Sequence, residues 1–138
     1  MIIADSGRLI GAARRRLARR ASPVVDGLTR TVIADQLGRS DVAGLDFVDE
    51  TAEVLLKKLT GMPAYLALAM LGTTVVFDQS ARVRGGRKFR SLDHERRMAW
   101  LDLWRGAPVG VFRDFVAFYE KMGVFVYYTH IEEAGAHG

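Results

Sequence analysis

Helical periodicity, interrupted by glycine and proline, is the feature that most constrains how this 138-residue chain can fold. Apolar residues recur at steps of three and four along successive segments, which is the spacing of one face of an α-helix. Gly38, Gly61, Pro63, Gly106 and Pro108 separate these segments, and strand signals are scarce. The sequence therefore predicts an all-α protein, a compact bundle of about five to six helices.

The composition is typical of one self-sufficient domain. Hydrophobic residues make up 49% of the chain and charged residues 26%. A domain of this size buries roughly two thirds of the surface that its unfolded chain exposes. The absence of cysteine excludes disulfides, thiolate ligands and a thiol nucleophile within the chain. We expect a basic arm over 1–21, a helical domain over 22–131 and a flexible tail over 132–138.

The first segment is rich in arginine, with six arginines and no acidic residue between Arg8 and Arg20. An apolar stripe that includes Leu9 and Leu17 predicts an amphipathic helix over about 6–20. Ser22 as N-cap and Pro23 at the first helical position predict that a separate helix follows and ends at Gly38. The basic contact residues that we expect in the arm are Arg14, Arg15, Arg16, Arg19 and Arg20.

A second basic stretch runs from Arg82 to Arg97, and it contains six arginines and Lys88 against two acidic residues. We expect two separate basic faces, either simply solvated or in contact with nucleic acid, anionic lipid or an acidic protein. Nucleic acid is disfavoured, because helix-turn-helix and zinc patterns are absent and no aromatic residue interleaves the N-terminal arginines. Gly85-Gly86 lies in an expected loop over 78–90 and lacks the spacing of a phosphate-binding P-loop.

The segment 59–77 contains 19 consecutive uncharged residues, close to the roughly 20 apolar residues of a membrane span. Pro63 begins a new helix and leaves about 15 residues, which favours a buried central helix instead. The arginine pairs near the N-terminus resemble a twin-arginine leader, but Ser22, Pro23 and Asp26 interrupt any apolar region. A cytoplasmic or membrane-associated location is therefore favoured, with export alongside a partner left open.

Two aromatic-rich helices are expected at the C-terminal end, the first capped by Ser91 and the second beginning at Pro108. The second is apolar around much of its circumference, which suggests burial on more than one side. For any single aromatic residue a role in the core is the simpler interpretation, and a partner protein would explain the excess. The predicted partner-interface residues are Trp100, Trp104, Phe112, Phe115, Tyr119, Tyr127, Tyr128 and His130.

A second set of aromatic, arginine and leucine residues is spaced along the C-terminal part of the chain, namely Phe89, Leu92, Arg96, Trp104, Arg113, Phe115, Tyr119, Tyr127 and Tyr128. Their spacing resembles the helical small subunit of membrane-bound gluconate dehydrogenases, and also a helical segment that precedes the flavin domain of some long-chain alcohol oxidases. Both relatives accompany flavoenzymes of the glucose–methanol–choline oxidoreductase family. The resemblance implies a non-catalytic accessory subunit, with FAD in the partner and a cytochrome or other acceptor receiving electrons. It places the run that ends at His130 where the helical piece meets the flavoprotein.

No catalytic, cofactor-binding or metal-binding residues are predicted within the chain itself. His130 is more simply a histidine at a helix end than a ligand, because His94 is remote in sequence. A small helical enzyme that uses Asp78, Tyr119 or His130 lacks a convergent nucleophile, base and orienting group. The main alternative is a peripheral membrane protein that binds anionic lipid through its arginine-rich amphipathic helix.

Overall fold

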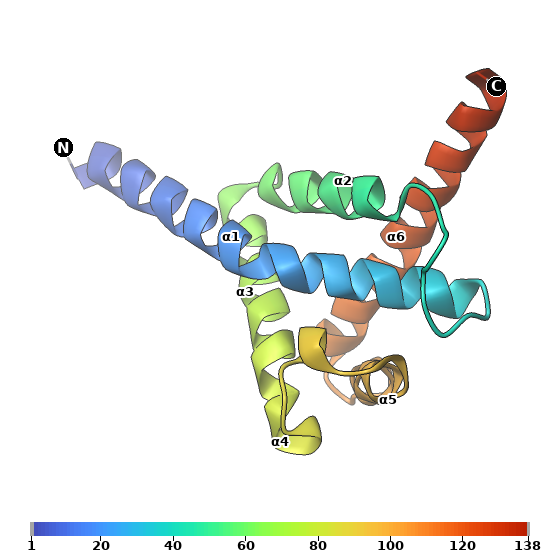
Figure 1. The fold of residues 1–138 in the computed structure, drawn as a ribbon. Coiled ribbons are helices and arrows are strands. Elements are labelled where there is room, and N and C mark those ends of the chain that lie inside the picture. The colour runs from blue at the N-terminus through green and yellow to red at the C-terminus, as the bar shows by residue number, and fades with distance from the viewer. Residues whose placement is uncertain (1, 138) are drawn as a thin grey trace.

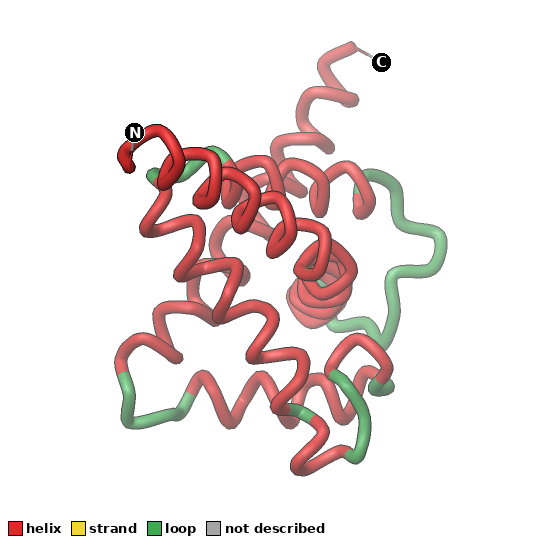
Figure 2. The backbone as a smooth tube through the Cα atoms, turned by 90° about the vertical axis from the view of Figure 1, so that its left-hand side faces the viewer, coloured by secondary structure: helices red, strands yellow, loops and turns green. Residues whose placement is uncertain are grey.

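The computed structural model describes residues 2–137, and this range is all-helical, which confirms the predicted compact bundle (Figures 1 and 2). Five long helices make up most of it, joined by one short α-helical turn and one 3₁₀ turn. The elements in chain order are α1 (Ile2–Gln36), α2 (Val48–Thr60), α3 (Ala64–Ser80), α4 (Arg82–Gly85), η1 (Phe89–Ser91), α5 (His94–Arg105) and α6 (Gly110–His137).

The central helix of the bundle is α1, which packs against α2, α3 and α6. Its inward stripe of Val24, Val25, Leu28 and Val32 is almost completely buried. Burying a branched aliphatic side chain stabilises a fold by about 1.5–3 kcal/mol. This one stripe is therefore a main source of the stability of the bundle.

The helix expected to begin at Pro63 is present as α3, but the expectation that it is a buried central helix is wrong. One face of α3, which includes Leu71 and Phe77, is fully buried, whereas Tyr65 and Val76 on another face are 73% and 57% exposed. The segment is apolar on all sides, so its sequence does not distinguish the buried face from the exposed one. In the part of the chain that the structure describes, no helix is both long and apolar enough to cross a membrane.

The predicted break at Ser22 and Pro23 is also wrong, because both residues lie inside the continuous helix α1. Proline lacks an N–H group, so the carbonyl of Arg19 loses its usual intrahelical hydrogen bond. Ser22 and Pro23 are both exposed, and the helix changes direction near its middle (Figure 1). Burial of Ala21 and Val24 on the opposite face offsets the lost bond.

The predicted C-terminus of this helix at Gly38 is confirmed. Gly38 adopts a left-handed φ of 69°. Its N–H donates to the carbonyl of Asp35 at 3.1 Å, and the Arg39 N–H donates to the carbonyl of Ala34 at 2.8 Å. This pair of bonds is the Schellman motif, in which glycine takes the left-handed conformation without a steric penalty.

Two predicted helix starts near the C-terminal end each lie two residues too early. Ser91 belongs to η1, and the N-cap of α5 is Asp93, whose Oδ1 accepts a hydrogen bond from the Arg96 N–H at 2.9 Å. Helix α6 begins at Gly110 and not at Pro108. Aspartate is as good an N-cap as serine, so Ser91 and Asp93 both fit the sequence preference for an N-cap, and the structure uses Asp93.

The last helix is longer than predicted. The residues expected to form a flexible tail continue α6 as far as His137, and Gly138 lies outside the described residues. Figure 1 shows the final turns of α6 extending beyond the bundle, on the side away from the N-terminal arm. The large apolar side chains Phe125, Tyr128 and Ile131 in this part are 64%, 40% and 40% exposed.

Helix α6 comes very close to α1 at Gly123. A Cβ atom at this position would lie 3.1 Å from Cγ2 of Val32 and 3.8 Å from Cδ1 of Leu55. The missing side chain therefore allows α6 to pack closely against α1 and α2. Gly135, in the same helix, has open space around the equivalent position.

Gly123→Leu is expected to lower the free energy of unfolding by about 2 kcal/mol or more, because the added side chain overpacks a buried helix contact. Gly135→Leu is the matched control, and it should leave stability unchanged or slightly raised, since leucine favours helix more than glycine does. Urea unfolding followed by circular dichroism measures both. Equal stability of the two variants would contradict the close α1–α6 contact.

Tyr119 carries a buried polar contact between α6 and α3. Its hydroxyl lies 2.7 Å from Oγ1 of Thr74, and Thr74 Oγ1 in turn donates to the Met70 carbonyl at 2.8 Å. Thr74 therefore accepts its bond from the Tyr119 hydroxyl. Burial raises the pKa of Tyr119 above its ordinary value, and the hydrogen bond with Thr74 opposes this only in part.

Stability should therefore fall at alkaline pH. Because the folded-state pKa of Tyr119 is raised, its contribution is complete below the unfolded value of about 10 and is lost as the pH rises toward the folded-state pKa. Tyr119→Phe is expected to cost about 1 kcal/mol at neutral pH and to weaken the alkaline loss. Unfolding free energies at pH 7 and above pH 10 measure both effects. An identical alkaline loss in the variant would show that Tyr119 is not its source.

Candidate functional site

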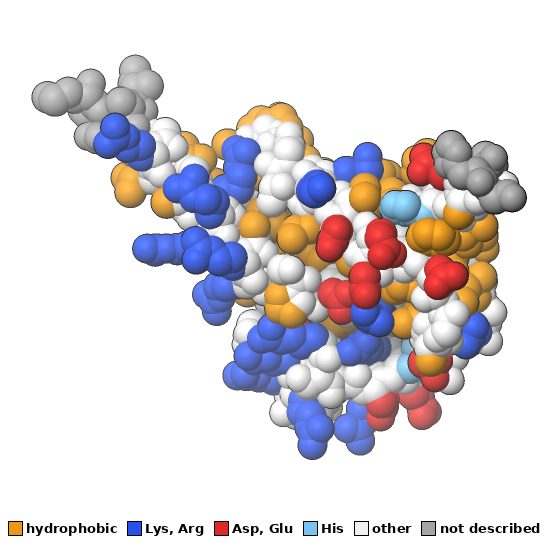
Figure 3. Space-filling model, turned by 45° about the horizontal axis from the view of Figure 1, so that its top comes forward, with side chains coloured by type: hydrophobic (Ala, Val, Ile, Leu, Met, Phe, Trp, Pro, Cys, Tyr) orange, Lys and Arg blue, Asp and Glu red, His pale blue; other side chains and the backbone are white. Residues whose placement is uncertain are grey.

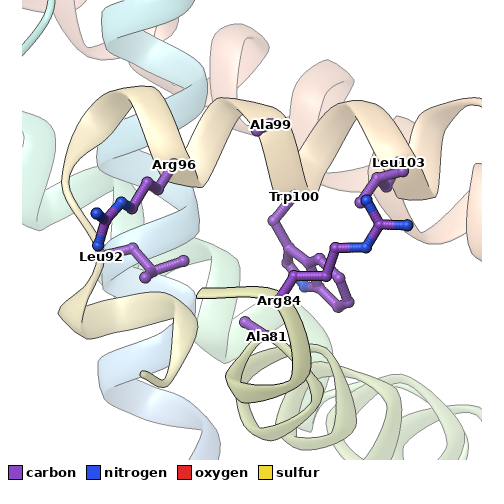
Figure 4. A pocket seen from close by; sticks show the side chains of 7 residues that line it. All are labelled: Ala81, Arg84, Leu92, Arg96, Ala99, Trp100 and Leu103. Atoms are coloured by element: carbon purple, nitrogen blue, oxygen red, sulfur yellow. The ribbon is translucent and has the colours of Figure 1, made fainter. Parts of the chain in front are cut away.

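A cavity of about 350 Å³ lies between α4 and α5 (Figure 4). Trp100 lies in its middle, while the Arg84 guanidinium lies beside Leu103 at one end and the Arg96 guanidinium lies beside Leu92 at the other. The remaining lining side chains are apolar. The full set is Ala81, Arg84, Leu92, Arg96, Ala99, Trp100 and Leu103, and we call this site the Trp100 groove.

The indole of Trp100 is held in place from behind. Its Nε1–H donates to the carbonyl of Phe77 at 3.1 Å, and its ring packs at centroid distances of 6.3 Å and 6.4 Å against Phe77 and Trp104. Because its only polar atom is already paired inside the protein, the indole offers a purely apolar face to the groove. The side chain is thus pre-positioned without a ligand.

The two arginines give the groove a positive charge. Within the described residues Arg84 forms no ion pair, and Arg96 lies 4.0 Å from Asp93 in a pair that is largely exposed. An exposed pair of this kind contributes little, so the Arg96 guanidinium remains accessible to a ligand carboxylate. An apolar floor between two guanidinium groups suits an apolar group flanked by acidic groups.

Four of the eight predicted interface residues lie in the core instead of on the surface. Trp104, Phe115, Tyr119 and Tyr127 are at most 7% exposed. The rings of Trp104 and Phe115 pack around Phe77 at centroid distances of 4.8 Å and 5.3 Å. In this conformation these four side chains hold the helices together, and a partner cannot contact them directly.

The other four predicted residues are accessible but separated. Trp100 lines the groove, Phe112 is 37% exposed near the start of α6, and Tyr128 is 40% exposed near its end. His130 is half-buried, and its ring stacks on Phe47 with centroids 5.9 Å apart. No group of three or more metal-ligating side chains occurs among the described residues.

Arg14 differs from the other arginines of the predicted basic face. Its Nη1 donates to the carbonyl of Thr60 at 3.1 Å, so the half-buried guanidinium caps the C-terminal end of α2. A cation at this end is favoured by the helix dipole. Arg15, Arg16, Arg19 and Arg20 are exposed, as predicted. Arg14 therefore anchors the arm to the bundle.

The expectation of two separate basic faces is wrong. Arg19 and Arg20 of α1 line one cavity together with Lys88 and Arg90, which come from the second basic stretch. Figure 3 shows lysine and arginine side chains gathered on one side of the molecule, along the arm and below it, while acidic side chains gather toward the other side. The fold joins two stretches that are far apart in the sequence.

The predicted interface residues include Trp100 but none of the arginines and leucines around it, of which Leu92 and Arg96 appeared only among the residues that carry the family resemblance. Arg96, Trp100 and Leu103 follow an i, i+4, i+7 spacing, which places them on one face of a helix. This spacing is visible in the sequence and could have placed Arg96 and Leu103 beside Trp100. Arg84, in contrast, lies in a segment that was expected to be an irregular loop. The segment instead forms the helical turn α4, which positions Arg84 beside the groove.

Neither a protein-family model nor a curated protein or solved structure matches the chain. The fold and the site define the chain as a small helical bundle that carries an apolar, positively charged groove.

Proposed function

We propose that this chain is a non-catalytic accessory subunit that binds and stabilises a larger protein. The Trp100 groove carries this proposal. Tryptophan and arginine are the residue types that most often dominate the binding energy of protein interfaces, and here they line one preformed cavity. A partner would place an apolar side chain on Trp100 and acidic side chains near Arg84 and Arg96.

The proposed partner is an FAD-dependent dehydrogenase of the glucose–methanol–choline family that acts on an alcohol, sugar or steroid. The resemblance of the aromatic and arginine spacing supports this choice. Two of the residues that carry this resemblance, Leu92 and Arg96, line the Trp100 groove. FAD and the redox chemistry would belong to the partner, which would pass electrons to a cytochrome or another acceptor.

A second exposed surface supports a partner larger than a peptide. Phe112 lies near the start of α6, and Phe125, Tyr128 and Ile131 lie along its C-terminal half. Stable protein interfaces bury about 800 Å² on each side, which is more than the groove alone offers. Contact along α6 would add apolar area to the contact at Trp100.

Leu103→Glu and Arg84→Glu should each weaken capture of a stoichiometric flavoprotein by the tagged chain from its native host at least tenfold. The first places a charge against the apolar floor, and the second reverses a charge that the partner would meet. Leu66→Glu on α3 is the matched control, because Leu66 and Leu103 are 42% and 43% exposed. Flavin absorbance of the eluate is the measurement.

Failure to recover any flavin-containing protein with the unaltered chain would contradict the choice of partner. Recovery that is equally weakened by Leu103→Glu and Leu66→Glu would contradict the Trp100 groove as the binding site. Circular dichroism of each variant establishes that the fold is retained, which is expected because the substituted side chains are exposed.

A second candidate function is peripheral membrane binding through the arm. The observation that favours it is the projecting half of α1, where Leu9 is 70% exposed and Ile10 is 40% exposed near the exposed cations Arg15 and Arg16. An apolar stripe beside arginines is the pattern of a helix that lies in the membrane interface. Arg14 would hold this helix at a fixed position on the bundle.

Leu9→Asp should abolish co-sedimentation with vesicles of phosphatidylcholine and phosphatidylserine if the arm inserts its apolar side chains. Val76→Asp, at a 57% exposed position on α3, is the control and should bind as the unaltered chain does. Equal vesicle binding by Leu9→Asp and the unaltered chain would remove the arm from this role.

A further inference from the structure

Two adjoining cavities on the basic side of the molecule share Lys88 and Arg90. The smaller, of about 250 Å³, is also lined by Arg19 and Arg20 of α1 and by residues of α3. The larger, of about 560 Å³, is also lined by Arg82, Gly86, Arg87 and Ser91. We call these two cavities together the double basic site.

The backbone brings these side chains together in two steps. Gly86, with a left-handed φ of 74°, ends α4 and turns the chain back toward α1. The backbone of Arg90 then passes close to Gly27 of α1, where a Cβ atom would lie at an ordinary contact distance of 3.8 Å from the Arg90 Cα. As a result η1 packs against both α1 and α3.

Cations greatly outnumber carboxylates around the double basic site. Six lysine or arginine side chains line it, and Asp78 is the one acidic residue in either lining. Asp78 is 1% exposed and is already engaged by Arg90, whose N–H donates to Oδ1 at 3.0 Å and whose Nε lies 3.6 Å from Oδ2. Asp78 thus positions Arg90 from below.

The other five cations have no carboxylate partner within the part of the chain that the structure describes, and they are Arg19, Arg20, Arg82, Arg87 and Lys88. Like charges gathered around a hollow repel one another, and an anion placed between them removes this repulsion. The single negative charge of the buried Asp78 cannot neutralise six cations. The site is therefore electrostatically suited to a multivalent anion.

We propose that the double basic site binds a ligand that carries two phosphate groups, one in each cavity, with Lys88 and Arg90 between them. Guanidinium groups pair with phosphate through two parallel hydrogen bonds, and lysine contributes a compact charge. This site is separate from the Trp100 groove, since none of the residues that line the two basic cavities lines the groove. The phosphates would belong either to a soluble metabolite or to a lipid headgroup.

Calorimetric titration of the full chain with inorganic pyrophosphate at low salt tests the proposal. Pyrophosphate should bind more tightly than inorganic phosphate, because only it carries two phosphate groups for the cations on either side of the shared Lys88 and Arg90. Lys88→Gln and Arg20→Gln should each weaken binding about tenfold, the loss expected for one charge-assisted hydrogen bond. Arg113→Gln is the control, since it removes one charge from an exposed arginine that lines neither cavity.

Vesicles separate the two sources of phosphate. Tighter binding to phosphatidylcholine vesicles that contain phosphatidylinositol bisphosphate than to phosphatidylserine vesicles of equal charge, lost in Lys88→Gln, would support a lipid headgroup. Equal binding to both vesicles, with pyrophosphate binding that depends on Lys88, would support a soluble ligand. Absence of pyrophosphate binding would overturn the proposal, and so would equal weakening of that binding by Lys88→Gln and Arg113→Gln. Binding of duplex nucleic acid with an affinity that Lys88→Gln leaves unchanged would also overturn it.

Discussion

The packing of aromatic rings around Phe77 is the interaction on which the rest of the structure depends. Phe77 of α3 contacts Phe89 of η1 at a centroid distance of 4.7 Å and also packs against rings from α5 and α6. Its carbonyl accepts the hydrogen bond of the Trp100 indole. One residue thus joins the core to the floor of the groove, so a change in aromatic packing would move the candidate site as well as weaken the fold.

Local signals predicted the fold well where one residue type satisfies one backbone requirement. Gly38 ends a helix because a left-handed residue is needed there, and that need is visible in the sequence. Pro23 misled the prediction, since burial of Ala21 and Val24 keeps the helix continuous despite the lost hydrogen bond. The exposed face of α3 was missed because its apolar residues lie on every side of the helix.

The candidate site was less predictable than the fold, since it depends on contacts between distant segments. Trp100 was identified as an interface residue from its type and neighbours, yet Trp104, four residues later, belongs to the core. The sequence does not reveal that Arg20 lies beside Lys88, because this juxtaposition is set by how η1 crosses α1. Periodicity identifies faces of helices, whereas it does not say which faces meet.

The continuity of α1 gives the molecule a fixed internal length. At about 1.5 Å per residue, its 35 residues extend for roughly 50 Å along the helix axis, through the change of direction near Pro23. One half is embedded in the bundle and Arg14 fastens the other half to the end of α2. The tip of the arm is therefore held at a set distance from the bundle. Two molecules bound at opposite ends of α1 would accordingly be kept at a fixed separation.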